Sequence, residues 1–160
     1  MINQYLRLFS LSIIFLFISG KVLADALPQN MMIISDLIMW SDTKTKTLQL
    51  LGQPDSISKI DNEIDDIELT LWKYGKSELH FDSEHLSNFV LRDRSLDLTV
   101  LKDVYVGQSK ATLIITLNNR GFSIINGDSA LRLPIADTAY FLLIEFEQQH
   151  ISSISIWLDN

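Results

Sequence analysis

The 160-residue chain contains no cysteine, and this absence excludes several kinds of site at once. Without cysteine there is no disulfide, no thiolate metal ligand, no cysteine nucleophile and no lipid-bearing N-terminal cysteine. Glycine and proline are scarce, with six and three residues, which excludes collagen-like and low-complexity behaviour. Hydrophobic residues make up 47% of the chain, which is enough for the core of one domain or of two small units.

Basic residues are in the minority, with 13 Lys and Arg against 20 Asp and Glu, so the formal net charge is −7. Such a surface repels nucleic acid and anionic lipid head groups, and it attracts a basic partner. We therefore expect the partner to be a basic protein, and we expect neither nucleic acid nor a lipid surface to bind.

The N-terminal region resembles a secretory signal peptide. A polar start is followed by the apolar run LFSLSIIFLFIS, which is shorter than the roughly 20 residues of a membrane-spanning helix. Ala24 and Ala26 have the small side chains that signal peptidase reads. We expect residues 1–24 to be removed. The mature chain then has 11 basic and 20 acidic residues and a net charge of −9. We expect it to lie in a bacterial periplasm without a stable membrane anchor. An uncleaved N-terminal anchor is the alternative.

The mature chain reads as two units with the same order of elements. In the first, a helix over 41–51, capped by Ser41 or Asp42, precedes strands at 67–74, 77–82 and 86–91. In the second, a helix over 109–121, capped by Ser109, precedes strands at 122–125, 130–133, 139–147 and 151–158. The Thr and Ile content of 109–121 leaves a strand as the alternative there.

The last hairpins of the two units match without a gap at an offset of 65 residues. The first unit contributes Phe81, His85, Leu86, Ser87, Phe89 and Leu91, and the second contributes Phe146, His150, Ile151, Ser152, Ile154 and Ile156. Each unit alone is too small to bury much surface. We therefore predict an α+β fold in which a duplicated helix-then-antiparallel-strands unit, 25–95 and 96–160, forms a curved sheet with the helices packed on one face.

Three short motifs of the first unit occur in a set of small, poorly characterised bacterial domains. These are LGQPD at 51–55, LWKYG at 71–75 and ELHF at 78–81, and the chain resembles that set over about residues 45–91. The element order and Gly107-Gln108-Ser109 are similar to the BamE-like (SmpA/OmlA) assembly lipoproteins and to the tandem β-lactamase-inhibitor protein. The lipid-bearing cysteine of the first group and the disulfides of the second are absent here. The resemblance implies a protein-binding scaffold and no catalytic residue.

No pattern in the sequence marks a catalytic or metal site. Nucleophile-elbow, zinc-protease and phosphate-loop motifs are missing, so we expect no enzyme activity, no cofactor and no bound metal. The acidic segment 61–68 fails as a calcium loop, because Asp66 and Trp72 occupy the positions of the required Gly and Glu. This segment is either a solvated loop or a contact for a basic partner, with Asp65 and Asp66 as the candidates. His85 and His150 fall at matching turns, where we expect each to bond a turn carbonyl.

The aromatic residues provide the strongest candidates for a binding site. If Leu69 and Leu71 face the helices, strand alternation places Trp72 and Tyr74 on the opposite face of the sheet. The same reasoning places Glu78, His80 and Trp157 on that outer face. Exposed indole rings beside polar groups are typical of binding hot spots. The alternative is that these rings close the core, because a slip of one residue would turn both indoles inward.

These observations lead to an expected function. We expect an exported protein-binding module, an inhibitor or immunity-type protein that blocks an envelope-acting toxin or hydrolase. A soluble envelope-assembly accessory protein resembling the BamE-like group is the alternative. An enzyme acting on peptidoglycan or glycans is a third hypothesis, and it requires a concave pocket with perturbed carboxylates.

Overall fold

The computed structural model describes residues 26–28, 32–62, 67–97, 101, 103–122 and 129–158. The expected signal peptide, Asp65 and Asp66, and all of the expected strand at 122–125 except Phe122, lie outside the described residues.

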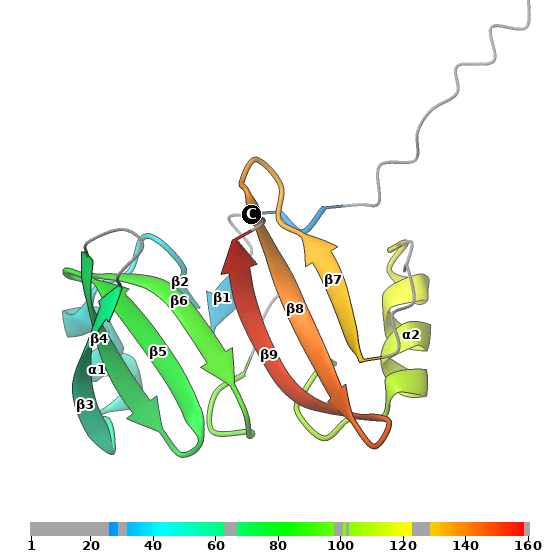
Figure 1. Cartoon of the computed structure of the whole chain (residues 1–160), viewed down its shortest axis with the longest axis horizontal. Helices are drawn as coiled ribbons and strands as arrows, with labels where there is room; N and C mark the ends of the chain where they lie inside the picture. Colours follow the sequence, from blue (N-terminus) through cyan, green and yellow to red (C-terminus); the bar gives the residue numbers. More distant parts are fainter. Residues whose placement is uncertain are drawn as a thin grey trace, which may run out of the picture.

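The described residues form an α+β fold with two helices and a seven-stranded antiparallel sheet (Figure 1), which confirms the predicted class. The sheet order is β3-β4-β5-β6-β9-β8-β7. Its strands are β3 (Ser56–Asn62), β4 (Ile67–Tyr74), β5 (Ser77–Asp82), β6 (His85–Leu91), β7 (Ala130–Pro134), β8 (Tyr140–Glu147) and β9 (His150–Leu158). The other elements are the small hairpin of β1 (Ile33–Ile34) and β2 (Leu37–Ile38), and the helices α1 (Lys44–Leu51) and α2 (Lys110–Asn119).

Polar side chains set the start of both helices. Thr43 caps α1 by accepting a hydrogen bond from the Lys46 N–H, one of the first-turn donors that has no partner within the helix. The predicted caps of α1 were therefore wrong, and Asp42 instead accepts a hydrogen bond from the Ile38 N–H at 2.8 Å. Ser109 caps α2 as predicted, which confirms a helix there rather than a strand.

The acidic stretch after Pro54 contains a strand that was not predicted from the sequence. Residues Ser56–Asn62 form β3 at one edge of the sheet and pair with β4 along its whole length. An edge strand that is exposed on both faces needs no apolar alternation, so its sequence carries little strand signal. This end of the sheet consequently consists of the antiparallel pair β3–β4.

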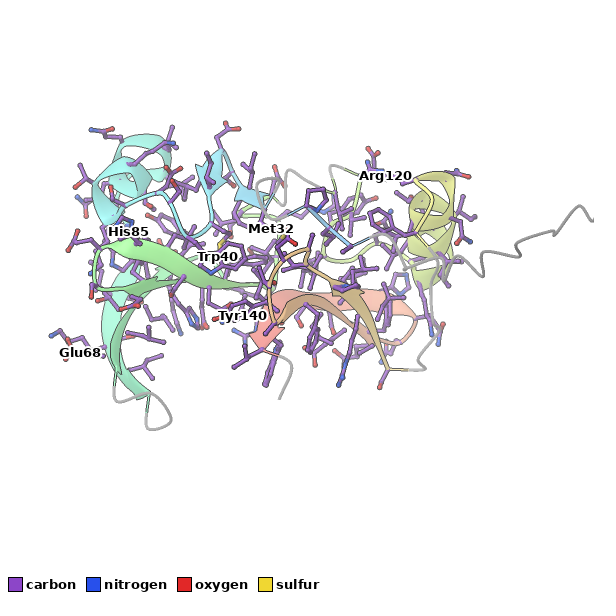
Figure 2. All side chains as sticks on the ribbon, turned by 90° about the horizontal axis from the view of Figure 1, so that it is seen from above. Met32, Trp40, Glu68, His85, Arg120 and Tyr140 are labelled. Carbon is purple, nitrogen blue, oxygen red and sulfur yellow. The ribbon has the colours of Figure 1, made fainter. Side chains whose placement is uncertain are left out.

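The core lies between one face of the sheet and the elements that cover it. Figure 2 shows α1, α2 and the β1–β2 hairpin on the same side of the sheet, while the β3–β4 end bends away from them. The rings of Trp40 and Tyr140 lie 5.7 Å apart and connect the segment before α1 with β8. Leu79, Phe81, Phe89, Ile144 and Ile154 are fully buried on the covered face. Burial of such side chains stabilises by about 1.5–3 kcal/mol each.

The two ends of the sheet are built with matching details. β5 has an irregularity between His80 and Phe81, and β8 has one between Glu145 and Phe146. The helix caps bridge the first residue of β6 and of β9, as Thr43–His85 and Ser109–His150. A lysine ammonium group from the start of each helix lies over a phenylalanine ring, Lys44 at 6.0 Å from the centre of Phe81 and Lys110 at 5.2 Å from the centre of Phe146. Each helix start is thus attached to its hairpin in the same way.

Candidate interaction surface

The face of the sheet opposite the helices, here called the open face, is continuous across all seven strands. One row of register neighbours crosses it, and residues paired across strands share a face. From β3 to β7 this row consists of Ser56, Lys73, Glu78, Val90, Ser155, Leu143 and Arg132. Strands from the earlier and the later part of the chain therefore contribute to a single surface, joined where β6 pairs with β9. Among the described elements, those outside the sheet lie on its other side (Figure 2).

The predicted exposure of Trp72 is wrong. Its side chain is only 4% exposed, and its ring lies 4.7 Å from that of Phe81 in the core. Tyr74 is also buried, and its hydroxyl donates a hydrogen bond to the Gly52 carbonyl at 3.0 Å. These two aromatic residues hold the helical layer against the sheet and are not available to a partner.

The hairpin turn explains why the predicted alternation is inverted. The two-residue turn Gly75-Lys76 pairs Tyr74 with Ser77, so Trp72 pairs with Leu79. Leu79 was correctly expected to face the core, and its register partner must share that face. Leu71 pairs with His80 and lies on the open face instead. Turn length, which sets the register, was the signal in the sequence that could have placed Trp72 correctly.

Trp157 lies on the open face as predicted and is 58% exposed. It pairs with Phe141 of β8, and its indole N–H donates to the Ser155 hydroxyl at 3.2 Å. The Arg132 guanidinium lies 4.9 Å from the centre of the Phe141 ring. We call Arg132, Phe141 and Trp157 the Trp157 cluster; Arg132 and Phe141 were not among the predicted site residues. A large exposed indole beside a guanidinium is the composition of a binding hot spot.

A second, polar group lies on the β4–β5–β6 part of the open face. Glu78 Oε1 lies 3.5 Å from the Lys73 ammonium and 3.3 Å from the Arg92 guanidinium. His80 Nε2 lies 3.7 Å from Glu78 Oε2, and this nitrogen is buried without a hydrogen-bond partner among the described residues. Glu78 and His80 thus lie on the expected face but are half-buried. Burial lowers the pKa of His80 and outweighs the attraction of Glu78, which raises it.

The lowered pKa of His80 predicts a specific pH dependence of stability. The unfolded chain binds a proton at the ordinary pKa of 6.5, whereas the folded protein binds it only at lower pH. The free energy of unfolding should therefore fall as the pH drops below 6.5, by at most about 1.4 kcal/mol for each pH unit separating the two pKa values. Urea titrations at several pH values, with wild type and His80→Gln compared, isolate this group. A wild-type dependence equal to that of the variant would contradict the prediction.

The other two histidines are the first residues of β6 and β9, directly after the turns in which they were expected. His85 Nδ1 lies 3.2 Å from the Ser41 carbonyl oxygen, and His150 Nδ1 lies 2.9 Å from the Gln148 carbonyl oxygen. Within the part of the chain that the structure describes, no group of three or more His, Asp or Glu side chains is placed to hold a metal ion.

Fold and surface together define an α+β protein whose antiparallel sheet is covered on one face and open on the other. The chain is similar to a crystal structure, at 1.5 Å resolution, of an extracellular protein containing an SCP domain from Bacillus anthracis str. Ames. The TM-score is 0.52 at 10% sequence identity, and the match covers 78% of this chain and 46% of that one. This similarity concerns the fold alone, and the chain spans less than half the length of that protein.

Neither a family model nor a curated protein matches the sequence. No described helix has the length and apolar character needed to cross a membrane.

Proposed function

We propose that the protein is an exported protein-binding module that acts as an inhibitor or immunity-type protein. It blocks an envelope-acting toxin or hydrolase by covering it with the open face. The observation that carries this proposal is the exposed Trp157 beside Phe141 and Arg132, on a sheet face that lies opposite the helices. Rings of this size bury much surface at little entropic cost, and arginine is likewise enriched at binding hot spots.

The partner is a basic protein of the periplasm. The chain has a net charge of −7, and complementary charge speeds association with a basic target. Occlusion of an active site needs an interface of ordinary size, about 800 Å² on each side. A sheet face crossed by seven strands offers a surface on that scale.

The two units are further proposed to be duplicates of one ancestral element. The sequence match at a constant offset of 65 residues supports this. The register shifts before Phe81 and before Phe146 support it as well, and so do the β-bridges from each helix cap to His85 and to His150. Duplication would explain how a small unit acquired a sheet wide enough to occlude an enzyme. The partner would then span both units across the β6–β9 joint.

Replacing Trp157 with alanine is expected to weaken binding of the partner by about 2 kcal/mol or more, roughly 30-fold. The partner is recovered by co-purification from periplasmic extract, and its affinity for each variant is then measured by calorimetry. Ile115→Ala is the matched control, because Ile115 is an apolar side chain, 61% exposed, on α2 at the covered side of the sheet.

Equal affinities of the two variants, or the absence of a stoichiometric partner, would contradict the proposal. Recovery of a membrane-embedded assembly machine, together with a permeability defect on deletion, would favour the envelope-assembly alternative.

A further inference from the structure

Two of the described arginine side chains lie over aromatic rings, and their surroundings differ. The Arg94 guanidinium lies 3.9 Å from the centre of the Tyr105 ring, in a small hollow that Asp93 and Asp97 also line. Its Nε–H donates a hydrogen bond to the Val106 carbonyl at 3.5 Å. Arg94 is therefore held by groups of its own chain, and its contacts are structural.

Arg132 has no such support beyond its ring contact. Its side chain is exposed, and its guanidinium lies 4.9 Å from the centre of the Phe141 ring. Within the described part of the chain, no carboxylate forms an ion pair with it and no carbonyl accepts a hydrogen bond from it. Glu145, two residues along β8 from the register partner of Arg132, instead accepts a hydrogen bond from the Ser153 hydroxyl. The N–H donors of Arg132 thus face solvent, while the ring beneath them fixes their position.

The register row through Arg132 is not acidic, although the whole chain has a net charge of −7. The other charged members of the row are Lys73 and Glu78, and the Glu78 carboxylate already contacts both Lys73 and Arg92. Arg132 is left as a positive charge without an ion-pair partner, next to the exposed indole of Trp157. A guanidinium has five donors in a planar fork, which matches the two oxygens of a carboxylate.

We propose that the Trp157 cluster binds a carboxylate of the partner and that Arg132 determines the specificity of this contact. The inference rests on the proposed function and names the chemistry of its central contact. Two parallel N–H···O bonds from the guanidinium fix both the distance and the orientation of the carboxylate. Phe141 supports the guanidinium, and Trp157 offers an apolar surface to the carbon chain that carries the acid.

A carboxylate at the contact is compatible with a partner that is basic overall. A glycan-cleaving hydrolase holds two carboxyl groups in its active-site cleft, whatever the charge of its remaining surface. A guanidinium bound to one of them would block the catalytic pair directly. The net charge of the chain then speeds the encounter with a basic protein, whereas Arg132 selects the docked orientation.

The first experiment needs no partner. The purified full protein is titrated with naphthylacetate, which joins a carboxylate to a flat apolar ring, and with naphthylacetamide, its neutral counterpart. Nuclear magnetic resonance follows the indole N–H of Trp157, which is assigned by its absence in Trp157→Ala. The acid should shift this resonance saturably, with a Kd on the order of 10 mM or lower. It should bind at least about fivefold more tightly than the amide.

Two arginine variants locate the charge that is responsible. Arg132→Gln should lower the affinity for naphthylacetate to that for the amide, a loss of about fivefold. Arg94→Gln is the matched control, because it makes the same change at the other arginine–ring pair and should leave the titration unchanged. The absence of a saturable shift, equal binding of acid and amide by the wild type, or equal losses in the two variants would overturn the proposal.

The co-purified partner separates this inference from the proposed function. Arg132→Gln should weaken binding of the partner by about tenfold or more, whereas Arg94→Gln should not. If Trp157→Ala weakens binding and Arg132→Gln does not, the interface is correct and the carboxylate contact is wrong. If neither substitution changes the affinity, the proposed function fails together with the inference.

Discussion

Replacing Trp72 with alanine is expected to lower the free energy of unfolding by about 3–5 kcal/mol, the range for truncation of a large aromatic residue in a core. The indole is almost completely buried, lies against the ring of Phe81 and shares its face with Leu79. Truncation removes these contacts and leaves a cavity beneath the helical layer, because close-packed surroundings relax only in part. A loss of this size would unfold a large fraction of a marginally stable domain.

Urea denaturation followed by circular dichroism measures this effect. Trp157→Ala is the matched control, since it removes the same side chain from the open face and should cost no more than about 0.5 kcal/mol. Equal destabilisation by the two substitutions would contradict the assignment of the two indoles to opposite faces.

Replacing Asp93 with alanine is expected to destabilise the protein by about 2 kcal/mol, because one carboxylate holds a loop against the β4–β5 turn. Asp93 Oδ2 accepts a hydrogen bond from the Lys76 N–H at 2.6 Å. Oδ1 accepts from the Ser77 hydroxyl at 2.9 Å, from the Ser95 N–H at 3.0 Å and from the Ser95 hydroxyl. The Asp93 carboxylate lies so close to the turn that a Cβ added to Gly75 would be 2.6 Å from Oδ2. Because the carboxylate is partly solvated, the expected loss of stability is near the lower end of the range for hydrogen bonds to a charged acceptor.

The same carboxylate should also give a dependence of stability on acid. Burial raises the pKa of Asp93, but the hydrogen bonds from Ser95, Lys76 and Ser77 outweigh it and lower the pKa from 3.8 to about 2. The stabilisation is therefore complete above pH 3.8 and disappears as the pH falls towards 2.

Urea midpoints measured across this pH interval should decline in wild type more steeply than in Asp93→Asn. Parallel declines would show that the loop does not depend on this charge. Wild-type stability of Asp93→Ala at neutral pH would contradict the predicted contribution of the hydrogen bonds.

Much of the fold could be predicted because local signals agreed with each other. The bounds of β4 and β5 follow from alternating apolar residues and the Gly75-Lys76 turn. Both helices follow from a polar cap, and only the choice of Thr43 over its neighbours as the cap of α1 was missed. β3 could not be predicted, since a strand exposed on both faces has a polar sequence that reads as loop.

The candidate surface was harder to predict than the fold. In β4 both alternating sets contain large apolar residues, so Leu71 and Trp72 are each buried, one on each face of the sheet. Apolar alternation alone therefore does not identify the core side, whereas the register does. Trp157 is less ambiguous, because Ile154 and Ile156 of the same strand are buried on the covered face. Arg132 is brought to the open face by pairing with Leu143, a contact between strands that sequence spacing does not reveal.

Hydroxyl-radical footprinting of the complex with its partner is the most direct measurement of whether the open face is the contact surface. The exposed side chains of Trp157 on the open face and of Ile115 and Leu50 on the helices are all available to the radical in the free protein. Oxidation of Trp157 should slow on complex formation by about tenfold, while Ile115 and Leu50 should react at unchanged rates. Protection of the two helix residues, with Trp157 oxidised as fast as in the free protein, would place the partner on the other side of the sheet and contradict the proposed function.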